Sequence, residues 1–158
     1  RLDRYGAGQD IGFDEPDGPA FDLATDIDIF TGGAVLFSTA FLDDLDGFDE
    51  RYFMYYEDVD LALRGQRRGW VYRCAPASRV WHEGGVSADG APAQRIFVTE
   101  RNRIWCLFRF AGWRSMASGL GLAVRRTRHA PRSVHFRALV AGLRGGPRRL
   151  WERRAGGH

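Results

Sequence analysis

Three acidic residues follow directly on a run of aromatic residues, and their types and spacing suit proton-transfer chemistry. The run covers residues 52–56 and includes Tyr55 and Tyr56, after which come Glu57, Asp58 and Asp60. From residue 59 onward, apolar residues recur at the i, i+3 and i+4 positions typical of a helix that buries one face. The acids therefore lie in the first turn of a predicted helix, where free backbone N–H groups and the helix dipole favour negative charge. A hollow walled by the two tyrosines and ending in carboxylates could bind a hydroxyl and take its proton.

The same acids also have a purely structural interpretation. Acids in a first helical turn are common because each stabilises the helix by ~0.3–1 kcal/mol. Asp60 and Arg64 stand at i and i+4, which predicts an ion pair on a solvated helix face. The three acids alone therefore fit both a catalytic site and a helix stabilised at its N-terminus, and the surrounding elements are needed to distinguish the two.

Length and composition are those of one globular domain. The chain has 158 residues, of which 44% are hydrophobic and 13% aromatic, enough to bury a core. It begins at Arg1 without a signal-peptide pattern, and no apolar run approaches the ~20 residues of a membrane span. Cys74 and Cys106 form neither a disulfide framework nor a metal-ligand spacing. We expect a reduced, cytoplasmic setting.

Charge divides the chain into an acidic front and a basic back. Residues 1–90 hold 8 arginines and 18 acids, residues 91–158 hold 15 arginines and 2 acids, and there is no lysine. We therefore expect different partners for the two parts. The arginines and tryptophans of the basic part could rest on anionic lipid headgroups or on the diphosphate of a lipid-linked acceptor. A solvated, partly disordered tail is the alternative.

Strand and helix patterns alternate in the middle of the chain, which indicates an α/β sheet. Strands are expected at 34–37, 70–74 and 78–82, helices at 39–45 and 94–110, and short amphipathic pieces at 134–143 and around 150–151. Gly32 and Gly33 predict a tight turn, with close approach of a ligand as the alternative. His82 falls at the end of a predicted strand, before a glycine-containing loop that could fold over a substrate.

Six motifs occur in order within residues 31–87: Thr31-Gly32-Gly33-Ala34, Gly47-Phe48-Asp49-Glu50, residues 52–61, Gly69-Trp70, Pro76 and residues 82–87. This series resembles the C-terminal half of a family-2 inverting glycosyltransferase of the GT-A type, close to the bacterial rhamnosyltransferase-like group. The resemblance covers about residues 26–106. It implies that residues 26–112 form the acceptor and catalytic half of a Rossmann-like α/β GT-A domain. Composition adds a loop-rich segment before it (1–25) and a basic, partly helical tail after it (113–158).

The chain departs from the family at its N-terminal half, which supplies the nucleotide pocket and an Asp-x-Asp metal motif. Asp26-Ile27-Asp28 has the Asp-x-Asp pattern, but it lies directly ahead of the Thr-Gly-Gly segment, which is the wrong place in the family's order of motifs. We therefore expect a fragment that binds donor poorly when isolated.

The resemblance implies catalytic and metal-binding roles for three residues. Asp58 matches the general base that deprotonates the acceptor hydroxyl, and Glu57 would position that acceptor. His82 matches a histidine that in some members joins a divalent metal, Mg²⁺ or Mn²⁺, which holds the donor diphosphate.

It also implies substrate contacts. Gly32 and Gly33 match the segment beside the donor sugar, and Tyr55 and Tyr56 would line the substrate pocket. Arg101, together with the neighbouring Asn102, matches a helix near the donor phosphates.

The expected partners are a nucleotide-diphosphate sugar and an acceptor hydroxyl on a cell-surface glycan or lipid-linked saccharide, as in cell wall polysaccharide biosynthesis. The basic tail would place the protein at the inner face of the membrane. Two alternatives stay open. One is a metal-dependent phosphohydrolase with Glu57, Asp58 and Asp60 as ligands, which helical geometry disfavours because the three point in separate directions. The other is a non-enzymatic module that docks on membrane or nucleic acid, although the aromatic residues resemble a helix core more than a base-stacking platform.

Overall fold

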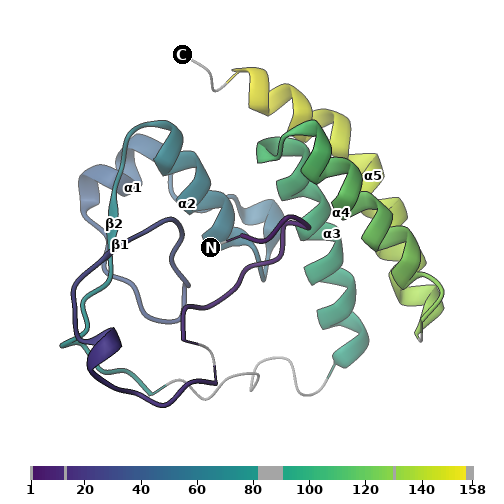
Figure 1. The fold of residues 1–158 in the computed structure, drawn as a ribbon. Helices are drawn as coiled ribbons and strands as arrows, with labels where there is room; N and C mark the ends of the chain where they lie inside the picture. The colour runs from purple at the N-terminus through teal and green to yellow at the C-terminus, as the bar shows by residue number, and fades with distance from the viewer. Residues whose placement is uncertain (1, 13, 82–90, 130, 156–158) are drawn as a thin grey trace.

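The computed structural model describes residues 2–12, 14–81, 91–129 and 131–155, and it is mainly helical (Figure 1). The elements in order are η1 (Pro19–Phe21, a 3-10 helix), β1 (Asp26–Ile27), α1 (Thr39–Leu45), η2 (Glu50–Tyr52, a 3-10 helix), α2 (Glu57–Arg67), β2 (Tyr72–Arg73), α3 (Pro92–Phe110), α4 (Trp113–Arg126) and α5 (Arg132–Ala155). Figure 1 shows α1, α2 and the strand pair on one side of the molecule and α3, α4 and α5 together on the other. This mixed helical arrangement with a small sheet is consistent with a partial α/β domain.

The sheet is much smaller than the sequence patterns predict. β1 and β2 pair antiparallel, with Asp26 opposite Arg73 and Ile27 opposite Tyr72. The strand expected at 34–37 is wrong, because these residues are not in a strand and Leu36 is 97% exposed. Residues 78–81 are also outside any strand. A strand needs a neighbour for its N–H and C=O groups, and the described part of the chain places no second strand beside either segment.

The helices beside the sheet begin where the sequence patterns predict. The Ser38 side chain accepts a hydrogen bond from a backbone N–H of the first turn of α1 at 3.2 Å. Asp46 ends that helix in the left-handed conformation, with a φ of 55°. The helix predicted at 39–45 is therefore confirmed. Helix α2 also starts as predicted, with Glu57, Asp58 and Asp60 in its first turn.

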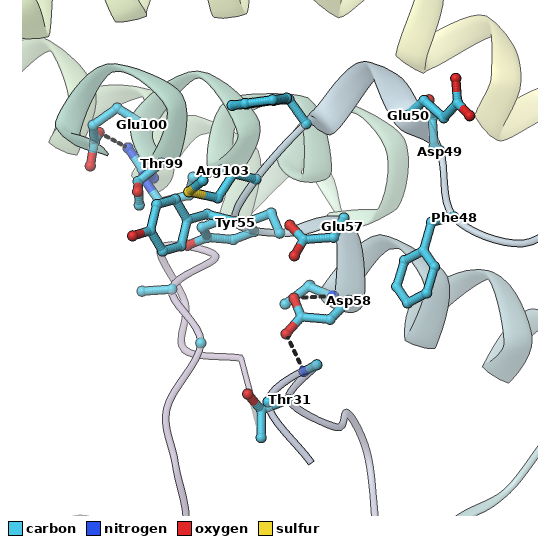
Figure 2. A pocket seen from close by; sticks show the side chains of 18 of the residues that line it. Thr31, Phe48, Asp49, Glu50, Tyr55, Glu57, Asp58, Thr99, Glu100 and Arg103 are labelled. Atoms are coloured by element: carbon cyan, nitrogen blue, oxygen red, sulfur yellow. Dashed lines mark hydrogen bonds and ion pairs between the residues drawn. The ribbon is translucent and has the colours of Figure 1, made fainter. Parts of the chain in front are cut away.

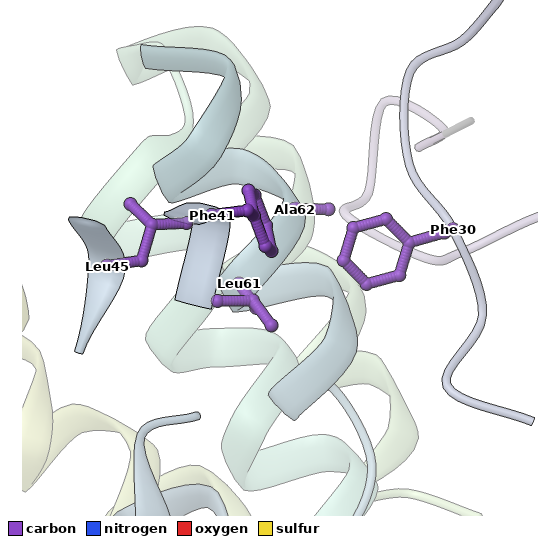
Figure 3. Close-up of a cluster of buried hydrophobic side chains, with 5 residues drawn as sticks. All are labelled: Phe30, Phe41, Leu45, Leu61 and Ala62. Atoms are coloured by element: carbon purple, nitrogen blue, oxygen red, sulfur yellow. The ribbon is translucent and has the colours of Figure 1, made fainter. Parts of the chain in front are cut away.

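Aromatic side chains form the core between α1, α2 and β2. Figure 3 shows its buried members, which are Phe30, Phe41, Leu45, Leu61 and Ala62. The ring of Phe41 lies edge-on to those of Trp70 and Tyr72, with centroids 5.3 and 5.9 Å apart. A side chain at Gly65 of α2 would collide with Phe41 and with the Tyr72 hydroxyl. Glycine here lets the Tyr72 hydroxyl donate to Ala62 O at 2.6 Å, which holds α2 against the strand pair.

Most of the basic back half is helical in the residues that the structure describes. The helix expected at 94–110 is α3, and the short pieces expected at 134–143 and 150–151 belong to one long helix, α5. Glycines of α5 face α3, because a Cβ at Gly142 would lie 2.8 Å from Ile104 and one at Gly146 would lie 2.7 Å from Phe108. The two backbones can therefore approach closely. Among the described helices, none combines the length and the apolar character needed to cross a bilayer.

The Asp60–Arg64 pair corrects the expectation of a solvated helix face. Asp60 is 0% exposed and accepts from Arg64 Nε at 2.8 Å and from Arg109 Nη1 of α3 at 2.7 Å. The pair therefore joins α2 to α3 in the interior of the protein. A buried charge of this kind needs its partners, since an unpaired one is very costly.

A second buried ion pair joins α5 to the loop that precedes α2. Arg149 is 2% exposed, and its Nη1 donates to Asp49 Oδ2 at 2.6 Å. Its guanidinium lies 4.8 Å from the ring centroid of Tyr52 and 4.6 Å from that of Trp105. Burial alone would raise the pKa of Asp49, but hydrogen bonds from Arg51 and Arg149 outweigh it and hold that pKa well below its ordinary value. Arg149 of the basic half thus fixes the loop that precedes α2 through Asp49.

Candidate active site

A cleft of about 980 Å³ opens at the start of α2 (Figure 2). Four parts of the chain line it: the first segment at Ala7-Gly8, the turn at 31–33, residues 48–50 and 53–59, and side chains of α3 and α4. Figure 2 shows Glu57 and Asp58 on one side of Tyr55, and Glu100 and Arg103 on the other. A cleft of this volume can hold a small-molecule ligand.

Two backbone N–H groups hold the Asp58 carboxylate. Oδ2 accepts from Gly32 N at 2.8 Å, and Oδ1 accepts from Val59 N at 2.7 Å. Gly32 and Gly33 form a turn, as predicted, and both also line the cleft. Each carboxylate oxygen keeps a further lone pair, so Asp58 can still accept the proton of a bound hydroxyl.

The neighbouring Glu57 carboxylate is the less satisfied of the two. Its Oε2 atom is buried and has no hydrogen-bond partner among the described residues. Burial raises the pKa of Glu57, and the nearby Asp58 carboxylate adds to the rise, while a backbone hydrogen bond offsets part of it. A carboxyl group with a free, buried oxygen in a cleft is ready to bind a donor group of a ligand.

The loop that aims these carboxylates has an unusual backbone. Phe53, Tyr55 and Tyr56 have φ values of 65°, 62° and 70°, which non-glycine residues rarely adopt. Asn102 of α3 is 0% exposed and clamps the loop through its Nδ2. That nitrogen donates to the carbonyl oxygens of Tyr52, Met54 and Tyr55, at 2.9, 2.9 and 2.7 Å.

The structure places the predicted substrate-binding residues on two sides of the loop. Tyr55 and Tyr56 line the cleft, and the Tyr56 hydroxyl also donates to Gly6 O at 3.0 Å. Arg101 is not among the residues that line the cleft. Its guanidinium donates to Tyr52 O at 3.0 Å and lies 4.4 Å from the Trp105 ring centroid. Contact of Arg101 and Asn102 with donor phosphates stays a prediction, and here both bind the loop.

The predicted metal site lies only partly within the described residues. His82 is outside them, and the described residues contain no group of three or more His, Cys, Asp or Glu side chains placed to hold a metal ion. Asp58 and Glu57 could supply the oxygen ligands that Mg²⁺ and Mn²⁺ prefer, but two carboxylates do not complete a site. A metal-binding role for His82 stays a prediction.

The far end of the cleft was not predicted from the sequence. It contains Thr99, Glu100 and Arg103 of α3 and Arg126 of α4. Glu100 forms ion pairs with Arg103, at 3.0 Å, and with Arg126. Thr99 and Arg103 stand at i and i+4, so they could have been recognised as one helix face. Arg126 reaches them only through the packing of α4 on α3.

Comparisons with known proteins identify two relatives. Both are called N-acetylglucosaminyl-diphospho-decaprenol L-rhamnosyltransferase, and they come from Mycobacterium tuberculosis strains CDC 1551 / Oshkosh and ATCC 25618 / H37Rv. Each is 34% identical to this chain over 84 residues, which cover 52% of this chain and 27% of the relative. The match thus spans about a quarter of each relative's length. No family model matches the chain, and no solved structure matches it significantly. The similarity supports a glycosyltransferase-like relationship.

Proposed function

We propose that this chain forms the acceptor-side, catalytic part of an inverting family-2 glycosyltransferase with a GT-A domain. The sugar, which we take to be L-rhamnose, would pass from a nucleotide-diphosphate donor to a hydroxyl of a lipid-linked saccharide that enters a cell-surface glycan. The proposal is carried by the 34% identity to two proteins named as L-rhamnosyltransferases of N-acetylglucosaminyl-diphospho-decaprenol. It is supported by adjacent carboxylates at the wall of a large cleft.

Asp58 is the proposed general base. A hydroxyl is a poor nucleophile, and a carboxylate within ~2.6–3.2 Å can take its proton as the new bond forms. The hydrogen bonds from Gly32 N and Val59 N, at 2.8 and 2.7 Å, stabilise the ionised form and fix its direction. The acceptor oxygen bonds to the anomeric carbon while the bond to the diphosphate breaks, and attack opposite the leaving group inverts that carbon. The proton ends on Asp58.

The neighbours of Asp58 have roles that follow from their positions. The unpartnered Oε2 of Glu57 would accept a hydrogen bond from a second acceptor hydroxyl and so orient the sugar. The Gly32-Gly33 turn would lie along the donor sugar, which brings its anomeric carbon close to Asp58 because Gly32 N contacts that carboxylate. We also propose Mg²⁺ or Mn²⁺ as cofactor, with His82 as one ligand, since a divalent ion neutralises a leaving diphosphate.

A lipid-linked acceptor lies at a membrane, so we propose that the basic helices contact its cytoplasmic face. Trp113 at the start of α4 and Trp151 near the end of α5 are 71% and 67% exposed. Indole rings on a surface rich in arginine suit the headgroup region of an anionic membrane.

The test is sugar transfer by the complete gene product that carries this sequence. Asp58→Asn should lower kcat by 10²-fold or more, the usual contribution of a general base. It should lower Tm only slightly, because asparagine keeps one of the two backbone hydrogen bonds that the carboxylate accepts. Asp28→Asn is the matched control, because Asp28 is an exposed acid away from the cleft. Turnover retained in Asp58→Asn would remove this residue from the mechanism. Metal-dependent release of phosphate from a simple ester would instead favour the phosphohydrolase, although the burial of Asp60 in ion pairs with arginines argues against a shared metal site.

A further inference from the structure

A second hollow lies where α4 ends and α5 begins, with a volume of about 450 Å³. Its lining residues are Leu122, Arg125, Arg126, His129 and His135. We call it the α4–α5 pocket. Within the described chain, its lining contains two arginines and two histidines and no carboxylate. An acid-free pocket of this composition attracts anions.

His135 gives independent evidence that a hydrogen-bonding ligand belongs in this pocket. Its Nδ1 atom is buried and has no hydrogen bond among the described residues. A buried polar atom left unpaired is costly and calls for a partner. Burial lowers the pKa of His135, and the positive charge of Arg126 and the proximity of His129 lower it further. The local field is therefore positive, and an oxygen of an anion would satisfy the ring nitrogen.

Arg126 connects this pocket to the cleft, because it lines both. On the cleft side it forms an ion pair with Glu100. Arg125 is the next residue, and it is exposed at the pocket with no carboxylate partner in the described chain. Guanidinium groups bind both phosphate and carboxylate oxygens with two parallel hydrogen bonds. A phosphate group is the better match here because it offers three acceptor oxygens and up to two negative charges to two arginines and two histidines.

We propose that the α4–α5 pocket binds a phosphate or diphosphate group. A ligand that reaches from Asp58 along the cleft to Arg126 could place its diphosphate there. Identifying this group as the acceptor's diphosphate rests on the proposed function, whereas the affinity of the pocket for phosphate does not.

The first test is a titration of the full chain with inorganic pyrophosphate, followed by NMR of the histidine side chains. The chain has 4 histidines, and His129 and His135 should shift saturably while His158 does not. A shift confined to His82 would assign the anion to the predicted metal region and overturn the proposal. Absence of saturation below about 10 mM would also overturn it, because that is weaker than a ΔG° of about −2.7 kcal/mol.

Matched charge variants give the second test. Arg125→Gln should weaken pyrophosphate binding tenfold or more, the loss expected for one charge-assisted hydrogen bond. Arg114→Gln removes the same charge from the first turn of the same helix, where Arg114 is exposed and stacks near Trp113, and it should change binding less than twofold. Equal losses in both variants would mean a general electrostatic effect and would refute a specific pocket.

Vesicles distinguish the source of the phosphate. Phosphatidylglycerol vesicles that shift the His129 and His135 signals, and that pyrophosphate displaces, would assign the pocket to lipid-borne phosphate. Shifts with pyrophosphate alone would assign it to a free or nucleotide phosphate. These measurements use no sugar transfer, so their failure leaves the Asp58 test intact, and failure of the Asp58 test leaves the pocket intact.

Discussion

The Asn102 clamp allows a quantitative prediction. Asn102→Ala removes the donor shared by three loop carbonyls, of which Tyr52 O keeps Met54 N and Arg101 Nη2, at 2.8 and 3.0 Å. Met54 O and Tyr55 O have no second donor among the described residues. Leaving a buried acceptor unpaired costs about 1–3 kcal/mol, so the two together amount to about 2–6 kcal/mol. Because Met54 and Tyr55 are only partly buried, water can reach them, and we expect the lower part of that range.

Urea unfolding followed by tryptophan fluorescence measures this loss. Arg95→Ala is the matched control, since Arg95 is an exposed residue of the same helix and should change the free energy of unfolding by less than about 0.5 kcal/mol. Asn102→Asp separates hydrogen bonding from space filling, because it keeps the volume but turns a carboxylate toward three carbonyl oxygens. It should cost at least as much as the alanine variant. An aspartate variant milder than the alanine variant, or an alanine variant equal to the control, would refute the clamp.

Two further predictions concern buried acids. Asp60→Ala leaves Arg64 and Arg109 in the interior without their shared carboxylate and should lower the free energy of unfolding by about 3–5 kcal/mol. Arg148→Ala is the control, because it removes an arginine that is 70% exposed, and it should cost less than about 1 kcal/mol. Similar losses for the two variants in urea unfolding would contradict the burial argument. Glu57→Gln should raise Tm at pH 7.5. The pKa of Glu57 lies above its ordinary value of 4.5 in the folded state, so its stabilising contribution is complete below that pH and is lost as the pH rises through the folded pKa. The gain should vanish near pH 4, and a gain independent of pH would contradict the assignment.

Local patterns predicted the helices well. The helix patterns at 39–45 and after Glu57 depend on residues within one or two turns, and both helices begin where expected. The prediction of a strand at 34–37 failed because a continuous run of apolar residues says nothing about a neighbouring strand. Val35 has high strand propensity and is nonetheless exposed, and the neighbouring Leu36 is 97% exposed. Strand propensity describes how well a residue fits on the surface of a sheet, so it does not produce a strand where there is no neighbouring strand.

The end of the cleft that contains Glu57 and Asp58 could be predicted from the sequence, whereas the end that contains Glu100 and Arg126 could not. Glu57 and Asp58 are adjacent, so the pattern already placed them together. By contrast, Asn102 reaches carbonyls 47 to 50 positions earlier in the chain, and Arg126 meets Glu100 across 26 positions. Nothing in the residue types marks such pairs. An aspartate at i and an arginine at i+4 suggested a surface pair at Asp60, whereas its burial depends on Arg109, 49 positions away.

Helix α5 has an intrinsic weakness that affects the order in which the protein assembles. It carries Gly142, Gly145, Gly146 and Pro147 in its interior, and such residues disfavour an isolated helix by about 1 kcal/mol for each glycine and about 3 kcal/mol for the proline. The segment therefore forms a helix only when it packs against α3, whose large side chains fill the spaces above the glycines. Arg149 therefore reaches its position 4.8 Å from the Tyr52 ring centroid only once α5 has packed on α3. The loop that precedes α2 thus depends on a helix that is stable only in the folded protein, and separation of α5 from α3 would release Asp49 from Arg149.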